Sequence, residues 1–299
     1  MKHGGMVWLV ALALVASGAA VADAKTYRWV DPKGVVHYSD TPPQVAPVEG
    51  ERESLIAEAL DISGLKKSLE LIPGQIKAQI EQQRGPTAPK DKAGVLKILT
   101  DAFRPEVFYN AVRGEFQKGY DPQLMGLVVA RLREPLFRKM AALELEASSA
   151  EARSHIERFA REVQASPPPQ TRLGLIVRLE ASSGAAEFNL ELLVASFQAA
   201  IKAVTPMIPP ERRAKPADVD SAVRMLRAQQ QAIRAATLVN MLYAYRSTTD
   251  QELDEYAQFA ESEPGRWFNR LSRQGVLAAM TAAAEAAARQ TTKSLLPKS

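Results

Sequence analysis

Beyond residue 50, apolar side chains recur every three or four positions, the spacing that places residues on one face of an α-helix. The row formed by Phe108, Val112 and Phe116 is one example. Prolines stand between such rows and mark where one helix ends and the next begins. The pattern predicts a mostly α protein with a multi-helix, bundle-like domain.

Residues 25–43 follow a different pattern, in which strand-forming side chains dominate. Tyr27 and Trp29 precede the sequence Asp-Pro-Lys-Gly at 31–34, which suits a type I turn. Tyr38 lies in a second apolar run after that turn. These features predict a small N-terminal β-hairpin module over residues 25–47, placed before the helical domain.

The first 24 residues have the pattern of a secretory signal peptide. A short polar start precedes an uncharged apolar run from Met6 to Ala16, and Ala22 and Ala24 are the small residues expected before a cut. We expect cleavage after Ala24 and a periplasmic or secreted protein with no stable membrane span; the alternative is an uncleaved anchor. The chain has no cysteine, which excludes disulfides, thiol catalysis and lipid attachment through cysteine.

The three prolines at 167–169 give the strongest linker signal in the chain. They divide the helical part into unit one (48–166) and unit two (167–299). Four residues of unit one recur in unit two at a constant offset of 129 positions, which predicts an internal duplication. The recurring residues are Asp121, Leu124, Glu134 and Pro135, repeated as Asp250, Leu253, Glu263 and Pro264.

Several helix boundaries can be predicted inside these units. Asp121 is a candidate N-cap, and capping boxes are expected at Ser148 with Glu151 and at Thr249 with Glu252. Unbroken helical periodicity over 217–246 predicts one long helix of about 30 residues.

The hairpin segment, Y-R-W-V-D-P-K-G-V-V-H-Y-S-D-T-P-P at residues 27–43, resembles domain of unknown function 4124. This short module occurs near the N-terminus of many proteobacterial envelope proteins, and the resemblance implies no particular activity. The C-terminal helices resemble domain of unknown function 2059, a helical family of secreted bacterial proteins. Here Glu263 separates Ser262 from Pro264, a departure from that family's pattern. The residues that carry this second resemblance are Glu252, Leu253, Tyr256, Phe259, Ser262, Pro264, Gly265 and Arg266.

The sequence offers little catalytic chemistry. His37 and His155 are the histidines outside the signal peptide, too few for a typical zinc site, so we expect neither metal nor cofactor. The net charge of +4 comes from interspersed signs, which argues against nucleic acid binding. Paired carboxylates such as Glu144 and Glu146 are expected to be ordinary solvated positions on helices.

Two groups of residues are candidate binding sites. Tyr27, Trp29 and Tyr38 could form an aromatic platform, or they could instead be the hairpin's own core. Arg266 and Trp267 could form a cationic and aromatic contact surface, or Trp267 could pack inside while the arginine stays solvated.

The sequence therefore favours a non-enzymatic envelope protein that binds or assembles a protein partner. The alternative is a hydrolase of peptidoglycan or glycans, which would need two carboxylates facing each other across a cleft. The sequence leaves the partner, the substrate and the oligomeric state open.

Overall fold

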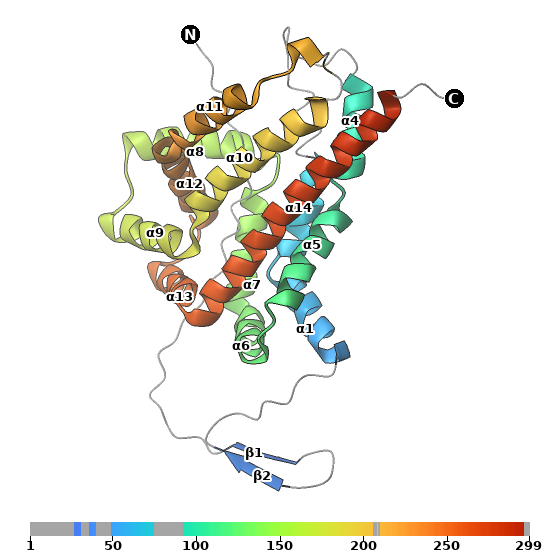
Figure 1. Ribbon diagram of the computed structural model, residues 1–299. Helices are drawn as coiled ribbons and strands as arrows, with labels where there is room; N and C mark the ends of the chain where they lie inside the picture. Colours follow the sequence, from blue (N-terminus) through green and yellow to red (C-terminus); the bar gives the residue numbers. More distant parts are fainter. Residues whose placement is uncertain are drawn as a thin grey trace.

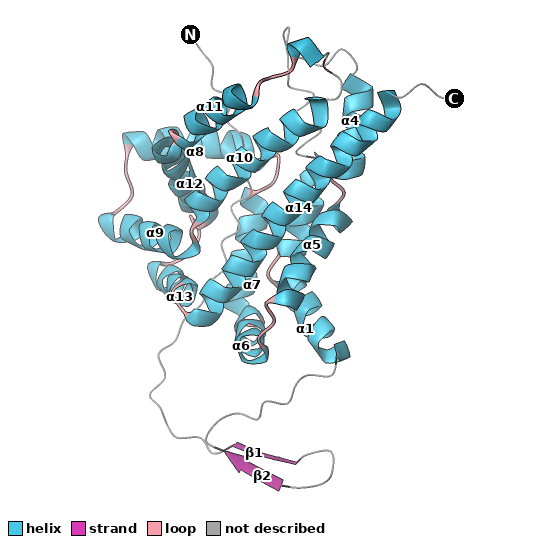
Figure 2. Cartoon of the chain, in the orientation of Figure 1, coloured by secondary structure: helices cyan, strands magenta, loops and turns pink. Residues whose placement is uncertain are grey.

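The computed structural model describes residues 27–30, 36–39, 49–74, 92–205, 208 and 210–295 of the 299-residue chain. The expected signal peptide and the turn at 31–34 lie outside the described residues. The described part is mostly helical (Figure 2), which confirms the prediction of a mostly α protein.

Two short strands precede the helices. β1 (Tyr27–Val30) pairs antiparallel with β2 (Val36–Ser39), and in this register Tyr27 lies opposite Ser39 and Arg28 opposite Tyr38. The side chains of both strands lie outside the described residues, so the hairpin remains a prediction as a separate module.

The helices follow in chain order (Figure 1). They are α1 (Glu49–Ile62), α2 (Leu65–Glu70), α4 (Lys92–Ala102), α5 (Pro105–Lys118), α6 (Pro122–Leu132), α7 (Pro135–Ala147), α8 (Ala152–Ala165), α9 (Gln170–Ser183), α10 (Ala185–Val204), α11 (Pro216–Arg227), α12 (Gln230–Ala244), α13 (Asp250–Ala260) and α14 (Glu263–Leu295), with the 3-10 turn η2 (Pro210–Arg212) before α11.

Prolines and caps set the helix starts. α5, α6 and α7 each begin on a proline, whose fixed φ suits the first turn and whose missing N–H has no partner to lose there. The Asp121 carboxylate accepts the backbone N–H groups of Gln123 and Leu124, both at 2.9 Å. Thr249 and Glu252 form the expected capping box, with Thr249 Oγ1 accepting the Glu252 N–H at 3.1 Å. These caps confirm two of the predicted helix starts.

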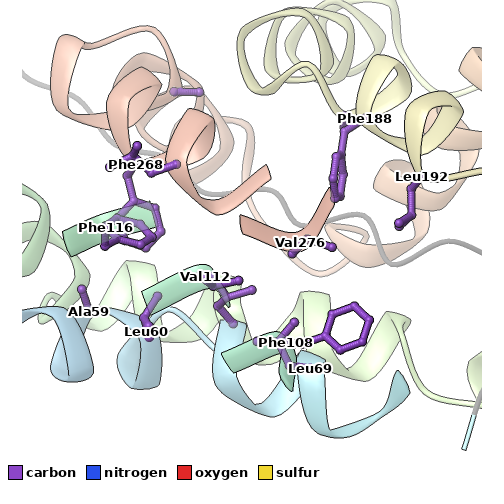
Figure 3. Close-up of a cluster of buried hydrophobic side chains, with 14 of the residues drawn as sticks. Ala59, Leu60, Leu69, Phe108, Val112, Phe116, Phe188, Leu192, Phe268 and Val276 are labelled. Carbon is purple, nitrogen blue, oxygen red and sulfur yellow. The ribbon is translucent and has the colours of Figure 1, made fainter. Parts of the chain in front are cut away.

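The long helix α14 is the centre of the core. It lies between α5 on one side and α10 on the other (Figure 1). Figure 3 shows Phe116 of α5 beside Phe268 of α14, and the two ring centroids are 5.0 Å apart. On the other side Val276 approaches Phe188 of α10 (Figure 3). Buried side chains from 48–166 and from 167–299 therefore form one continuous hydrophobic cluster.

The prediction of one helix over 217–246 is wrong. α11 ends at Arg227 and α12 begins at Gln230, so the chain turns at Ala228 and Gln229. No proline or glycine stands at this turn, and hydrophobic spacing alone gave no sign of it. The turn lets α11 and α12 each pack against α10 in its own direction, and α12 also reaches α7, α8 and α9.

The expected capping box at Ser148 is also wrong. α7 continues to Ala147, so Ser148 is its C-cap and its hydroxyl donates to the Glu144 carbonyl at 2.8 Å. The next residue takes over the capping role, because Ser149 Oγ accepts the N–H of Ala152 at the start of α8. A serine therefore does cap the start of α8, but it is Ser149 and not the predicted Ser148.

The three successive helices α5–α7 and the three successive helices α12–α14 share the spacing of several caps and buried positions. The N-cap residues Asp121 and Thr249 are 128 positions apart, and so are the buried positions of α6 and α13. The buried pair Val112 and Phe116 instead matches Met241 and Tyr245 at 129 positions. A single offset of 129 does not hold throughout, because the N-cap Thr249 lies four positions after Tyr245, whereas the N-cap Asp121 lies five positions after Phe116. The duplication itself stays a prediction.

Candidate functional site

A glutamate on the inner face of α7 is the centre of the candidate site. α7 buries Phe137, Met140 and Ala141. Glu144 follows at the same helical spacing, one turn further along this face. Sequence reasoning missed this residue because Leu136, Met140 and Leu143 form another apolar row at helical spacing, which leaves Glu144 outside it. The pattern in the sequence that points to it is the helical spacing of Phe137, Met140 and Glu144, which places Glu144 on the buried face.

Two tyrosines from two other helices meet the Glu144 carboxyl group. The hydroxyl of Tyr245, at the end of α12, donates to Glu144 Oε1 at 2.6 Å. The hydroxyl of Tyr256, on α13, donates to the same oxygen. Each tyrosine is 1 % exposed, and their ring centroids are 5.6 Å apart in an edge-to-face arrangement. One carboxyl oxygen thus joins α7, α12 and α13.

Enclosure changes the protonation of this group. Glu144 is half-buried and its Oε1 lies against both tyrosine hydroxyls, and burial raises the pKa of Glu144 to about 8. The two tyrosine hydroxyls lower the pKa, but by less than burial raises it. Burial and the nearby carboxyl raise the tyrosine pKa values well above their ordinary value. At neutral pH the carboxyl group therefore keeps its proton.

The expectation that Glu144 and Glu146 are both solvated is wrong for Glu144. Glu146 is exposed and pairs with Arg246 at 2.7 Å, as a solvated helix position would. Two residues earlier, the helical turn points Glu144 inward, because successive helix positions are about 100° apart. Helix periodicity thus separates two carboxylates that look alike in the sequence.

A neutral carboxyl group in an enclosed place can act as a general acid, so this cluster bears on the hydrolase alternative. Its neighbours are phenols, however, and they use the Glu144 oxygen internally. Among the described residues, Glu180 on α9 is the glutamate that is buried, and it is bonded to Arg234 at 2.8 Å. The described chain thus shows one carboxyl group with a raised pKa, at Glu144, rather than a facing pair.

Ion pairs surround the cluster. Lys139 of α7 bonds both carboxylate oxygens of Glu252, at 2.7 and 2.8 Å, and its hydrogen bond lowers the pKa of Glu252. Arg172 of α9 bonds Asp250 at 2.9 Å and also donates to the Tyr245 carbonyl. These contacts fix the ends of α12 and α13 around the buried carboxyl group.

The structure separates Arg266 from Trp267. Trp267 is 4 % exposed, its indole N–H donates to the Gly119 carbonyl at 3.0 Å, and its ring lies 5.6 Å from Phe116. Arg266 is exposed and donates to the Glu261 carbonyl. Trp267 therefore packs in the core, as the second sequence interpretation had it, and does not share a surface with Arg266. The side chains of Tyr27, Trp29 and Tyr38 lie outside the described residues, so that platform stays a prediction.

The described residues show neither a cluster of metal ligands nor a membrane-crossing helix. In this part of the chain, no three His, Cys, Asp or Glu side chains are grouped as metal ligands would be. None of the described helices combines the length and apolar character needed to cross a bilayer.

Comparison with known proteins gives one match. The family described as Domain of unknown function (DUF4124) matches residues 11–94, a segment that includes the hairpin. The match begins inside the expected signal peptide and extends through α1 and α2. No curated protein and no solved structure shows a significant match to the chain. The resemblance of the C-terminal helices to domain of unknown function 2059 remains a prediction.

Proposed function

We propose that this chain is a periplasmic or secreted, non-enzymatic protein of the cell envelope that binds a protein partner. The signal-like start of the sequence and the match of residues 11–94 to an N-terminal domain of unknown function support the compartment. The binding surface that the geometry favours is α11, together with the segment before it.

The observation that carries this proposal is the incomplete cover of α11. It packs on α10, yet none of its residues is buried. Val219, Val223 and Leu226 form a row at helical spacing that is only half-buried, and Met225 beside them is 62 % exposed. An amphipathic helix with a half-covered apolar row is the kind of element that partner helices and grooves engage.

The charges around this row suggest the partner's chemistry. Arg212, Arg213 and Lys215 precede α11 and are exposed, and Arg224 is exposed within it. Asp218 accepts the Lys215 backbone N–H at 3.3 Å, and the exposed Glu211 and Asp220 leave basic side chains in excess over this stretch. We therefore propose a protein partner with an apolar stripe bordered by acidic side chains.

Site-specific crosslinking in living cells tests this surface. A photoreactive residue at position 225 should give a discrete adduct with one envelope protein. The matched control is position 127 on α6, where Leu127 is 55 % exposed and lies outside the proposed surface. We expect Met225→Glu, but not Leu127→Glu, to weaken binding of the isolated partner at least tenfold. Equal effects of the two substitutions would exclude α11 as the binding surface.

The compartment has its own test. Cell fractionation with N-terminal sequencing of the purified protein should place it outside the inner membrane, beginning at Lys25. A full-length chain retained in the cytoplasm would contradict the proposed location, whatever the result at α11.

The hydrolase remains a second candidate because the half-buried Glu144, held by Tyr245 and Tyr256 and with a raised pKa, could serve as a general acid. Purified protein would then release soluble fragments from peptidoglycan, and Glu144→Gln would abolish that release. The non-enzymatic proposal predicts no release by either form, with intact folding of both checked by circular dichroism.

We also propose that α5–α7 and α12–α14 arose from one duplicated unit. The equal spacing of the two N-caps and of the buried rows of α6 and α13 supports this origin. Relatives of this chain should keep both rows apolar at that spacing. Relatives in which one row is polar throughout would speak against a common origin.

A further inference from the structure

Glu144 is the point where three helices are tied together by one carboxyl group. Its Oε1 accepts hydrogen bonds from the hydroxyls of Tyr245, at the end of α12, and Tyr256, in the middle of α13. The Phe137 ring of α7 also lies beside Tyr256, with ring centroids 5.6 Å apart. The three helices therefore meet in a small polar centre enclosed by aromatic rings.

The charged groups around this centre are engaged with one another. On α7 and α13, Lys139 pairs with Glu252, and on α9, Arg172 pairs with Asp250. Arg246, just after α12, pairs with Glu146 and lies over the Tyr243 ring at 4.0 Å.

α7 also contacts α6, α8 and the turn between α1 and α2, where Gly64 lies against Ala141. On α6, Arg131 pairs with Glu134 at 2.9 Å and lies 5.8 Å from the Phe137 ring. On α8, His155 is exposed. None of these charges is among the causes that set the protonation of Glu144, which are its burial and the two tyrosines.

We propose that Glu144 is a proton-controlled latch: while protonated, its carboxyl group holds α12 and α13 against α7, and loss of the proton releases this junction. The physical reason is that burial disfavours the charged form of Glu144, whose Oε1 is held by two phenols rather than by a cation. Opening the junction lets water reach the carboxylate and removes that cost.

The direction of the pH effect follows from proton linkage. In the closed state the pKa is about 8, whereas a solvated glutamate ionises near its ordinary value of 4.5. The closed state thus binds the proton more tightly, and its stability is full below the lower value and falls as pH rises towards 8. The equilibrium constant for opening should rise about tenfold per pH unit within this window and level off above it.

Hydrogen exchange measured by mass spectrometry between pH 5.5 and 9 tests the latch on the full-length folded protein. At each pH the exchange of peptides from α7, α12 and α13 is divided by that of the Glu144→Gln variant, which cancels the intrinsic pH dependence. We expect this ratio to rise about 50-fold between pH 6 and pH 8, because opening releases one proton until the closed state itself begins to ionise near pH 8. The partner-binding proposal can fail without affecting this result.

Two references make the result decisive. Glu146→Gln changes the exposed neighbour on the same helix and should leave the wild-type pH profile unchanged. Peptides from α4 and α5 of the wild type serve as an internal reference, should Glu144→Gln not fold. A ratio that stays constant within about twofold across the range, or a loss of the profile in Glu146→Gln, would overturn the latch.

Discussion

Gly275 of α14 lies directly against the backbone of Val112 on α5: a Cβ atom at position 275 would stand 2.5 Å from the Val112 Cα. The absence of a side chain is therefore what lets the central helix approach α5 so closely. We predict that Gly275→Ala destabilises the protein by about 2–3 kcal/mol, because the two helices must move apart. Urea unfolding of both forms measures the difference.

A second glycine gives the matched control. A Cβ at Gly114, also on α5, would meet nothing within 4 Å. Gly114→Ala should leave stability unchanged or raise it by up to about 1 kcal/mol through helix propensity. If Gly275→Ala behaved in the same way, the close approach of α14 to α5 would be disproved.

Thr249 and Ser148, both expected in capping boxes, should differ in their contribution to the free energy of unfolding. Thr249 caps α13 through its side chain, so Thr249→Ala should lower the free energy of unfolding by about 1 kcal/mol. Ser148 caps no helix start, and Ser148→Ala should cost less than about half of that. Thermal unfolding at one pH compares them. A larger loss at Ser148 would contradict the assignment of the caps.

Trp267 and Arg266 are neighbours in sequence with different structural roles. Trp267→Ala removes a buried ring and the hydrogen bond to Gly119, and we expect a loss of about 3–5 kcal/mol. Arg266→Ala changes an exposed side chain and should cost at most about 0.5 kcal/mol. Denaturant unfolding gives both values. Should Trp267→Ala keep full stability, the side chain would belong to a surface after all.

The existence of most helices could be predicted from the sequence because proline, cap and spacing signals agree there. Pro105, Pro122 and Pro135 each stand in the first turn of the helix they predicted. The turn at Ala228 could not be predicted, because tertiary packing on α10 rather than a local breaker produces it.

The candidate site was harder to predict than the helices. Glu144 is one of many glutamates on helices, and only the register of α7 distinguishes it. Its partners Tyr245 and Tyr256 are 101 and 112 positions away, and the sequence does not show which helices pack together. The same limit hid the central place of α14, whose neighbours α5 and α10 are distant in sequence.

Residues 48–166 and 167–299 share one core around α14. Trp267 is the sole tryptophan in 48–299, so its fluorescence reports on α14, while circular dichroism reports on all helices. In urea unfolding of a 48–299 fragment, the account predicts two curves that superimpose in one cooperative transition. Separate midpoints, with part of the helical signal lost before or after the Trp267 signal, would contradict it.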